Sequence, residues 1–326
     1  MCPERDTSRS IDPWGEGRIS ARVSQGSRAE TQEDSMQDNG MSRRSLIRAV
    51  GAAGAVAALP GTLAYAADPA VASTRPALVD PATPLDAQPH GGPLGTRAAS
   101  TLVFSDEFTG TSVDTNKWNI LDVDRGDYWY KASNVRVTNS ALAIDISNVG
   151  DGTYGGGRID SQGQFDFTFG TIEYSIHIPP TQGHLAAAWL QASNGVTPGG
   201  VVDGTARDGA EIDIMETFST ANQYGVTVHW DGYGADHQQS GTNVSAPGLH
   251  DTTWYHTVTL DWTSTRMTFS YDGTVVRTVT DPNLISQVRE FPIASHEVIP
   301  YAQGNIADAP LDYTSTMYVD YIRVWQ

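Results

Sequence analysis

From about residue 101 to the C-terminus, hydrophobic and polar residues alternate in short segments separated by turn-forming residues. The clearest alternating segments are 134–137, 141–146, 170–178, 255–262, 266–271, 274–279 and 317–325. Successive side chains of a β-strand point to opposite faces of a sheet, so this alternation predicts strands. No stretch of this region has the apolar spacing of a helix of three turns. The pattern therefore predicts an all-β structure.

Short polar segments join several of the predicted strands. Thr138-Asn139-Ser140 separates two of them, and Asp272-Gly273 forms a tight turn between two others. Frequent strands bounded by Gly, Pro, Asn and Asp are typical of an antiparallel β-sandwich. The sequence has no repeat of fixed period, which argues against a propeller or a solenoid. We expect residues 101–326 to form one domain of the sandwich type.

The chain before this region contains the pattern of an export signal. Arg43-Arg44 precedes a short apolar stretch over residues 49–59, and Ala64-Tyr65-Ala66 follows it. A charged segment, a short apolar segment and a small-residue site together predict a cleaved secretory signal over residues 41–66. The paired arginines favour the twin-arginine route of bacteria. The stretch is too short to span a membrane, so we expect a secreted, extracellular protein.

Two further segments flank the predicted signal. Residues 1–40 precede Met41, and we interpret them as an over-long start or a disordered extension. Residues 67–100 contain six prolines and no apolar periodicity, which is typical of an extended linker. The folded domain is therefore expected to begin near Thr101.

The chain is strongly acidic, with 38 acidic and 20 basic residues and a formal net charge of −18. Such a charge repels nucleic acid and anionic membrane surfaces, so we expect neither as a partner. The single cysteine, Cys2, excludes a disulfide framework, a cysteine-ligated zinc site and a thiol nucleophile in the body of the chain. Nothing in the sequence indicates a redox or nucleotide cofactor. We expect a monomer that requires no cofactor.

The most informative segment is residues 208–218, which read DGAEIDIMETF. In a strand, Glu211 and Asp213 share one face, and the apolar residues between the acidic ones point into the core. Strict alternation would place Glu216 on the opposite face, but a one-residue β-bulge between Asp213 and Glu216 returns it to the same face. Three carboxylates on one face of one strand are costly, because like charges at short range disfavour joint ionisation.

Glycoside hydrolysis gives such a strand a use. With the bulge, Glu211 and Glu216 lie about four ladder steps apart, roughly 13 Å between their Cα atoms. Side chains leaning together over a concave sheet would bring the two carboxyl groups to about 5–5.5 Å, the separation that retaining glycosidases use. Asp213 between them would tune the pair and help to hold one proton. We expect Glu211 to be the nucleophile and Glu216 the general acid/base.

Two different interpretations stay open for this strand when its residues are taken alone. It could be a solvent-facing acidic strand in an acidic protein, or it could form a calcium site, since clustered carboxylates suit hard cations. Calcium sites usually draw on loop carbonyls and irregular spacing. Here apolar residues interleave strictly with the acidic ones, which favours the glycosidase interpretation.

The sequence around this strand resembles the family sixteen glycoside hydrolases, laminarinase-like branch, of endo-β-1,3-glucanase type. The strand is similar to the family's E-x-D-x-x-E signature. Further similar segments follow in the family's order at 104–110, Trp118, 134–137, 157–161, 170–173, Trp189, 229–230 and 317–325. The resemblance implies a concanavalin A-like antiparallel β-jelly-roll sandwich with a substrate cleft on its concave face. It also implies a retaining, endo-acting mechanism.

The resemblance assigns roles to individual residues. It matches Glu211 to the family's nucleophile, Asp213 to its assisting carboxylate and Glu216 to its acid/base. It also implies a set of substrate contacts, in which aromatic side chains stack on sugar faces and polar ones bind hydroxyl groups. The expected substrate-binding residues are Asn134, Arg158, Trp189, His229 and Trp230.

A structural calcium ion is a further expectation that rests on the resemblance. Glu107 and Asp320 resemble positions near the calcium that many members hold on the convex face. The alternative is a polar residue pair that joins the first and last strands. Family members often supply a glycine carbonyl to the ion from the turn where this chain has Asn139-Ser140, and this departure weakens the expectation.

Two loops limit the prediction of the substrate. Residues 185–189 read LAAAW where familiar laminarinases tend to have Trp-Pro-x-Phe-Trp, and residues 231–237 form an unusual loop after His229-Trp230. Loops at the rim of a cleft decide which glycan fits. We expect hydrolysis of β-1,3-glucan, with agar, carrageenan or another galactan as the second choice of polymer. The same scaffold could also serve a transglycosylase or, less in keeping with two retained glutamates, a non-catalytic lectin.

Overall fold

The computed structural model describes residues 100–326, apart from 125–128, 181, 194–200, 252–254, 300, 301, 303, 313 and 314. The extension, export signal and linker that the sequence predicts before residue 100 lie outside the described residues. Among those described, no helix has the length and apolarity needed to cross a bilayer.

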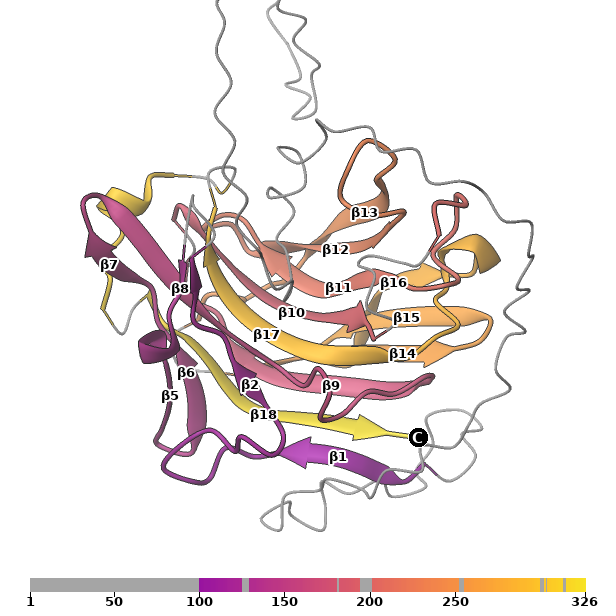
Figure 1. The fold of residues 1–326 in the computed structure, drawn as a ribbon, viewed down its shortest axis with the longest axis horizontal. Helices are drawn as coiled ribbons and strands as arrows, with labels where there is room; N and C mark the ends of the chain where they lie inside the picture. The colour runs from indigo at the N-terminus through magenta and orange to yellow at the C-terminus, as the bar shows by residue number, and fades with distance from the viewer. Residues whose placement is uncertain are drawn as a thin grey trace, which may run out of the picture. The chain divides into compact units, whose positions relative to one another are not determined.

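The described residues form two β-sheets that pack face to face (Figure 1). The eight strands of one sheet are β1 (Leu102–Asp106), β5 (Val135–Thr138), β6 (Ala141–Ile144), β9 (Gly170–His177), β14 (His256–Thr263), β15 (Arg266–Tyr271), β16 (Thr274–Val279) and β18 (Met317–Trp325). Their order is β16-β15-β14-β9-β18-β6-β5, and β1 also pairs with β18. The first and last strands of the described chain are therefore neighbours.

The second sheet carries the carboxylate strand. Its ten strands are β2 (Asn119–Ile120), β3 (Val123–Asp124), β4 (Trp129–Tyr130), β7 (Ser147–Gly150), β8 (Thr153–Asp160), β10 (His184–Ala192), β11 (Glu211–Thr217), β12 (Gln223–Trp230), β13 (Gln238–Ser245) and β17 (Glu290–Val298). Their order is β13-β12-β11-β10-β17-β8-β4-β3, with β2 and β7 also paired to β8. The described helices are short 3₁₀ turns at η1 (Ala132–Asn134), η2 (Pro282–Leu284) and η3 (Ile306–Asp308).

The antiparallel β-sandwich expected from the sequence is confirmed. Strands β15, β16 and β18 have the bounds that the alternation predicts. Asn139 and Ser140 take φ values of 51° and 58°, and Asp272 and Gly273 take 46° and 73°. Positive φ at both central residues is the geometry of a two-residue hairpin turn that matches the twist of the flanking strands. One pair, β4 with β8, is parallel.

The two faces of the ten-stranded sheet have different surroundings. Ile212 and Ile214 of β11 belong to the core between the sheets, together with apolar residues of β9, β14 and β18. On the opposite face, a second and smaller apolar cluster contains Trp189 of β10 and Phe291 and Ile293 of β17. Figure 1 shows that β10 and β17 are bent, with the eight-stranded sheet on their convex side. The second cluster therefore lies on the concave face.

A pair of histidines is buried between the sheets. His184 of β10 and His296 of β17 are both 0% exposed. His296 Nδ1 lies 2.9 Å from the carbonyl oxygen of Ile144 in the other sheet, and His296 Nε2 lies 2.7 Å from His184 Nδ1. Burial lowers the pKa of His184 to about 2 and that of His296 to about 4. Both imidazoles are therefore neutral in the folded protein near neutral pH.

This pair predicts that the sandwich loses stability in mild acid. Below pH 6.5 the unfolded chain protonates both histidines while the folded protein does not. Because the unfolded state binds more protons, the unfolding free energy decreases as the pH is lowered. Each histidine contributes about 1.4 kcal/mol per pH unit over this range. The variant His296→Gln should show a shallower fall of the unfolding free energy between pH 6.5 and 4.5 in chemical denaturation. Equal slopes in the two proteins would contradict the assignment.

Candidate active site

A β-bulge places the acidic side chains of β11 on one face. Glu211 pairs with His229 of β12, Asp213 pairs with Thr227, and Glu216 pairs with Gly225. Between these last two pairs, two residues of β11, Ile214 and Met215, thus lie opposite the single residue Val226 of β12. The pairing with β10 shifts at the same point. The predicted bulge is confirmed, and it returns Glu216 to the face that carries Glu211 and Asp213.

The acidic cluster on this face is almost completely buried. Glu211 and Asp213 are each 1% exposed and Glu216 is 4% exposed. His229, which is 3% exposed, places Nε2 at 3.0 Å from Asp213 Oδ2 and 3.8 Å from Glu211 Oε1. Burial of like charges on one face disfavours their joint ionisation, so the cluster favours sharing of protons among its members. The arrangement excludes a solvent-facing acidic strand.

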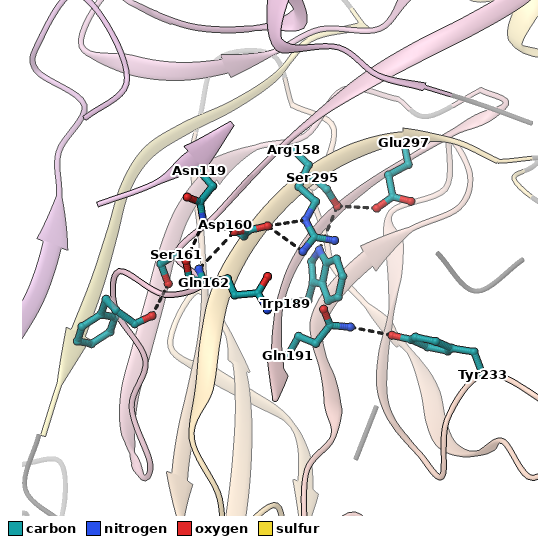
Figure 2. Close-up of polar contacts among 11 residues, drawn as sticks. Asn119, Arg158, Asp160, Ser161, Gln162, Trp189, Gln191, Tyr233, Ser295 and Glu297 are labelled. Carbon is teal, nitrogen blue, oxygen red and sulfur yellow. Dashed lines mark hydrogen bonds and ion pairs between the residues drawn. The ribbon is translucent and has the colours of Figure 1, made fainter. Parts of the chain in front are cut away.

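Two further side chains contact the cluster from the loop after β12. The Tyr233 hydroxyl donates a hydrogen bond to Glu211 Oε2, and it accepts one from Gln191 Nε2 of β10 at 2.9 Å (Figure 2). His237 Nε2 lies 2.9 Å from His229 Nδ1. The sequence indicated neither Tyr233 nor Gln191. The alternation of a strand could have indicated Gln191, because it lies two residues after Trp189 and so shares its face. No spacing rule locates a tyrosine in a loop.

A second polar network surrounds Trp189 on the same face (Figure 2). The guanidinium carbon of Arg158 lies 4.9 Å from the centre of the Trp189 ring. Arg158 also donates to Asp160 Oδ2 from Nε at 3.2 Å and from Nη2 at 2.9 Å. The indole nitrogen of Trp189 donates to Ser295 Oγ at 3.0 Å, and Ser295 Oγ donates to Glu297 at 2.9 Å. These bonds fix the orientation of Arg158 and Trp189 beside the carboxylates.

The structure corrects two of the expected substrate contacts. Trp230 follows His229 on β12 and therefore points to the opposite face, where it belongs to the core between the sheets. Asn134 donates both amide hydrogens to the carbonyl oxygens of Gly155 and Gly156, and its own oxygen accepts from Ser147. Its side chain holds η1 against β8. Arg158, Trp189 and His229 lie on the concave face with the carboxylates, as expected.

The geometry at Glu107 does not fit a calcium ion. Its carboxylate accepts from Arg323 Nε at 2.9 Å and from Arg323 Nη2 at 2.6 Å, so a guanidinium already supplies the positive charge. Asp320 accepts from Ser175 Oγ at 3.3 Å. Burial raises the pKa of Asp320, and nearby Glu107 raises it further. This arrangement is the polar pair that joins the first and last strands.

One group among the described residues brings three possible metal ligands together, two carboxylates and one imidazole. Single ligand atoms of Glu211, Asp213 and His229 lie within 4.8 Å of one another. His229 Nε2 lies 3.0 Å from Asp213 Oδ2, however, and the Tyr233 hydroxyl donates a hydrogen bond to Glu211. We therefore interpret the group as a cluster that shares protons.

A buried carboxyl group supports the start of the carboxylate strand β11. Glu290 of β17 is 0% exposed, and its Oε1 accepts from Ser286 Oγ at 2.5 Å and from the backbone nitrogen of Ala210 at 3.2 Å. Burial raises the pKa of Glu290 well above its ordinary value, which favours the neutral acid. It fixes the residue that immediately precedes Glu211.

Together, the fold and this face define a β-sandwich with a carboxylate cluster on the concave side of its larger sheet. The sequence profile described as glycosyl hydrolases family 16 matches residues 124–322, well over half of the chain. The chain belongs to this family.

Individual relatives agree with the family assignment. The chain is 25% identical over 266 residues to glucan endo-1,3-beta-glucosidase A1 of Niallia circulans, covering 70% of this chain and 38% of that protein. It is 26% identical over 256 residues to a beta-glucanase of Rhodothermus marinus, covering 69% of this chain and 85% of that protein. The laminarinase catalytic domain of Thermotoga maritima shares the fold, with a TM-score of 0.57, 23% identity and coverage of 70% and 98%.

The Glu107–Arg323 pair predicts that calcium does not stabilise the protein. Addition of calcium chloride or of a chelator should leave the midpoint of thermal unfolding within about 1 °C, a change of a few tenths of a kcal/mol. Arg323→Met should lower the unfolding free energy by about 3 kcal/mol, because it leaves a buried carboxylate without its partner. A clear rise in the unfolding midpoint with calcium would overturn the ion-pair interpretation.

Glu290 predicts the opposite pH dependence to the histidine pair. Above pH 4.5 the unfolded chain releases the proton of Glu290 while the folded protein retains it, so stability falls as pH rises. Glu290→Gln cannot ionise in either state and keeps an oxygen for Ser286 and Ala210. Relative to the wild type, the unfolding free energy of the variant should increase by up to about 1.4 kcal/mol per pH unit between pH 5 and 7. A constant difference in chemical denaturation across this range would contradict the assignment.

Proposed function

We propose that the chain is a secreted, retaining endo-β-glycanase that hydrolyses β-1,3-glucan by double displacement. The observation that carries the proposal is the bulged strand, which presents Glu211, Asp213 and Glu216 on one buried face beside His229. A retaining glycosidase uses two carboxylates on the same face, one as nucleophile and the other as general acid/base. The relatives named as glucan endo-1,3-beta-glucosidase and beta-glucanase support a β-glucan as the substrate.

In the first step, Glu211 attacks the anomeric carbon of a bound sugar while Glu216 donates a proton to the departing glycosidic oxygen. A covalent glycosyl ester of Glu211 forms and the leaving chain departs as an alcohol. In the second step, Glu216 accepts a proton from water, whose oxygen attacks the same carbon and releases Glu211. The anomeric configuration is inverted twice and so retained.

Asp213 and His229 assist this exchange. Asp213 lies between the two glutamates along the strand, and His229 Nε2 is 3.0 Å from its carboxylate. With His229 beside it, Asp213 spreads the shared proton and charge over the cluster while Glu216 changes from acid to base. Arg158 and Trp189 provide a charged hydrogen-bond donor and an aromatic ring for sugars next to the reacting unit.

Glu211→Gln should abolish hydrolysis. The change keeps the size of the side chain but removes the nucleophile, so kcat should fall roughly 10⁴-fold or more. The measurement is release of reducing ends from laminarin, lichenan, agarose, carrageenan and galactan. Glu173→Gln is the matched control, because Glu173 of β9 bonds to Tyr321 and Thr259 in the other sheet, and it should leave the rate unchanged.

Product analysis separates the candidate activities. Release from laminarin, with the β-anomer appearing first by NMR, supports the proposed substrate and mechanism. Release from a galactan alone would replace the glucan with that polymer. Longer oligosaccharides in place of reducing ends would indicate transglycosylation, and binding of laminarin without any product would indicate a lectin.

A further inference from the structure

The loop over residues 231–237 is held in place next to the carboxylate cluster. The Asp231 carboxylate accepts from the backbone nitrogens of Asp203 at 3.2 Å and Gly204 at 2.9 Å, and from Gln238 Nε2 at 2.9 Å. Asp231 is 4% exposed, with a φ of 60°. Because its ends and its first side chain are fixed by these bonds, the loop presents Tyr233 and His237 to the cluster in a defined geometry.

The hydrogen bonds of Tyr233 determine where its proton lies. The Tyr233 oxygen accepts a hydrogen bond from Gln191 Nε2 at 2.9 Å. A tyrosine hydroxyl has a single hydrogen, and this one is donated to Glu211 Oε2. Tyr233 is 6% exposed, so water does not compete freely for the bond. A neutral donor directed at one carboxylate oxygen favours the ionised form of Glu211 and leaves its other oxygen for attack.

The same loop supports the histidine of the cluster. His237 Nε2 bonds His229 Nδ1 at 2.9 Å, and His229 Nε2 faces Asp213 Oδ2 at 3.0 Å. A partner at Nδ1 decides the orientation of the His229 ring, and with it the atom that faces the carboxylates. Both contacts come from the segment in which this chain departs from familiar laminarinases.

We propose that Tyr233 is a positioning residue for the nucleophile: it holds Glu211 ionised and in the orientation for attack. His237 acts in the same way on His229. The inference rests on the proposed double displacement. It assigns a catalytic purpose to the loop over 231–237, which would otherwise be taken for a determinant of glycan choice alone.

The groups that surround Glu211 determine the pH at which it is protonated, and the acid limb of the kcat/KM profile reports that pH. Asp213 and Glu216 lie on its own strand, His229 faces it from β12, and Tyr233 from the loop. On the β10 side it is paired with Gln191, which has no charge. Loss of the Tyr233 hydroxyl removes a donor and leaves the neighbouring carboxylates in place. Protonation of Glu211 should then occur at higher pH.

The test is Tyr233→Phe in the full chain, assayed on laminarin. We expect kcat/KM to fall about 10- to 100-fold, the effect of losing a hydrogen bond to a charged group. The loss should lie in kcat, with KM within about two-fold, because the bond acts on the nucleophile. The acid limb of the kcat/KM profile should move to higher pH. Tyr224→Phe is the matched control, because the buried Tyr224 hydroxyl on β12 has no hydrogen-bond partner among the described residues.

The outcomes separate this inference from the proposed function. An active wild type with an impaired Tyr233→Phe, a shifted acid limb and an unaffected Tyr224→Phe supports the inference. An active wild type whose Tyr233→Phe variant keeps its rate and pH profile overturns it and leaves the proposed function standing. A fall in rate with an unchanged acid limb and unfolding at a lower temperature would show a structural role only. No product from the wild type would overturn the proposed function and this inference together.

Discussion

The burial of several carboxylates on one strand determines which side chains must surround them. Glu211, Asp213 and Glu216 are nearly inaccessible to water, where charge is costly unless donors and shared protons offset it. A bulge in β11 brings the third carboxylate to the face of the other two. Side chains from β10, β12 and the following loop then supply the hydrogen bonds. The proposed reaction requires these buried carboxylates, whereas their burial lowers the stability of the folded protein.

The sandwich supports this cluster from behind. One face of β11 contributes Ile212 and Ile214 to the core shared with the eight-stranded sheet, so the strand cannot slip in register without moving its isoleucines out of the core. Glu290 fixes the backbone at Ala210, and His296 links the two sheets through Ile144. These buried groups are neutral in the fold, one an acid and the other a base. They act in opposite directions over overlapping pH ranges, because the histidines weaken the fold as the pH falls below 6.5 and Glu290 weakens it as the pH rises above 4.5.

The loop after β12 connects sequence variation to mechanism. Family resemblance suggests the roles of the carboxylates, yet the residues that contact Glu211 and His229 from this loop belong to a segment unlike the familiar pattern. Loops vary more readily than strands because few buried backbone bonds depend on them. A scaffold can therefore keep its nucleophile while the donors around it change.

Alternation and turn residues were sufficient to predict the strands, the sandwich and the bulge, because these depend on local periodicity and on which face must be buried. The same reasoning placed Glu211, Asp213 and Glu216 on one face, whereas His229 was expected from the family resemblance. The resemblance also suggested Trp230, although alternation along β12 turns it away from the face of His229 and into the core, and it suggested Asn134 and Glu107, whose partners are distant in sequence. Tyr233, Gln191 and Glu290 were found only in the tertiary structure. A hydrogen bond between residues far apart in the chain leaves no periodic signal, so only the packed fold decides it.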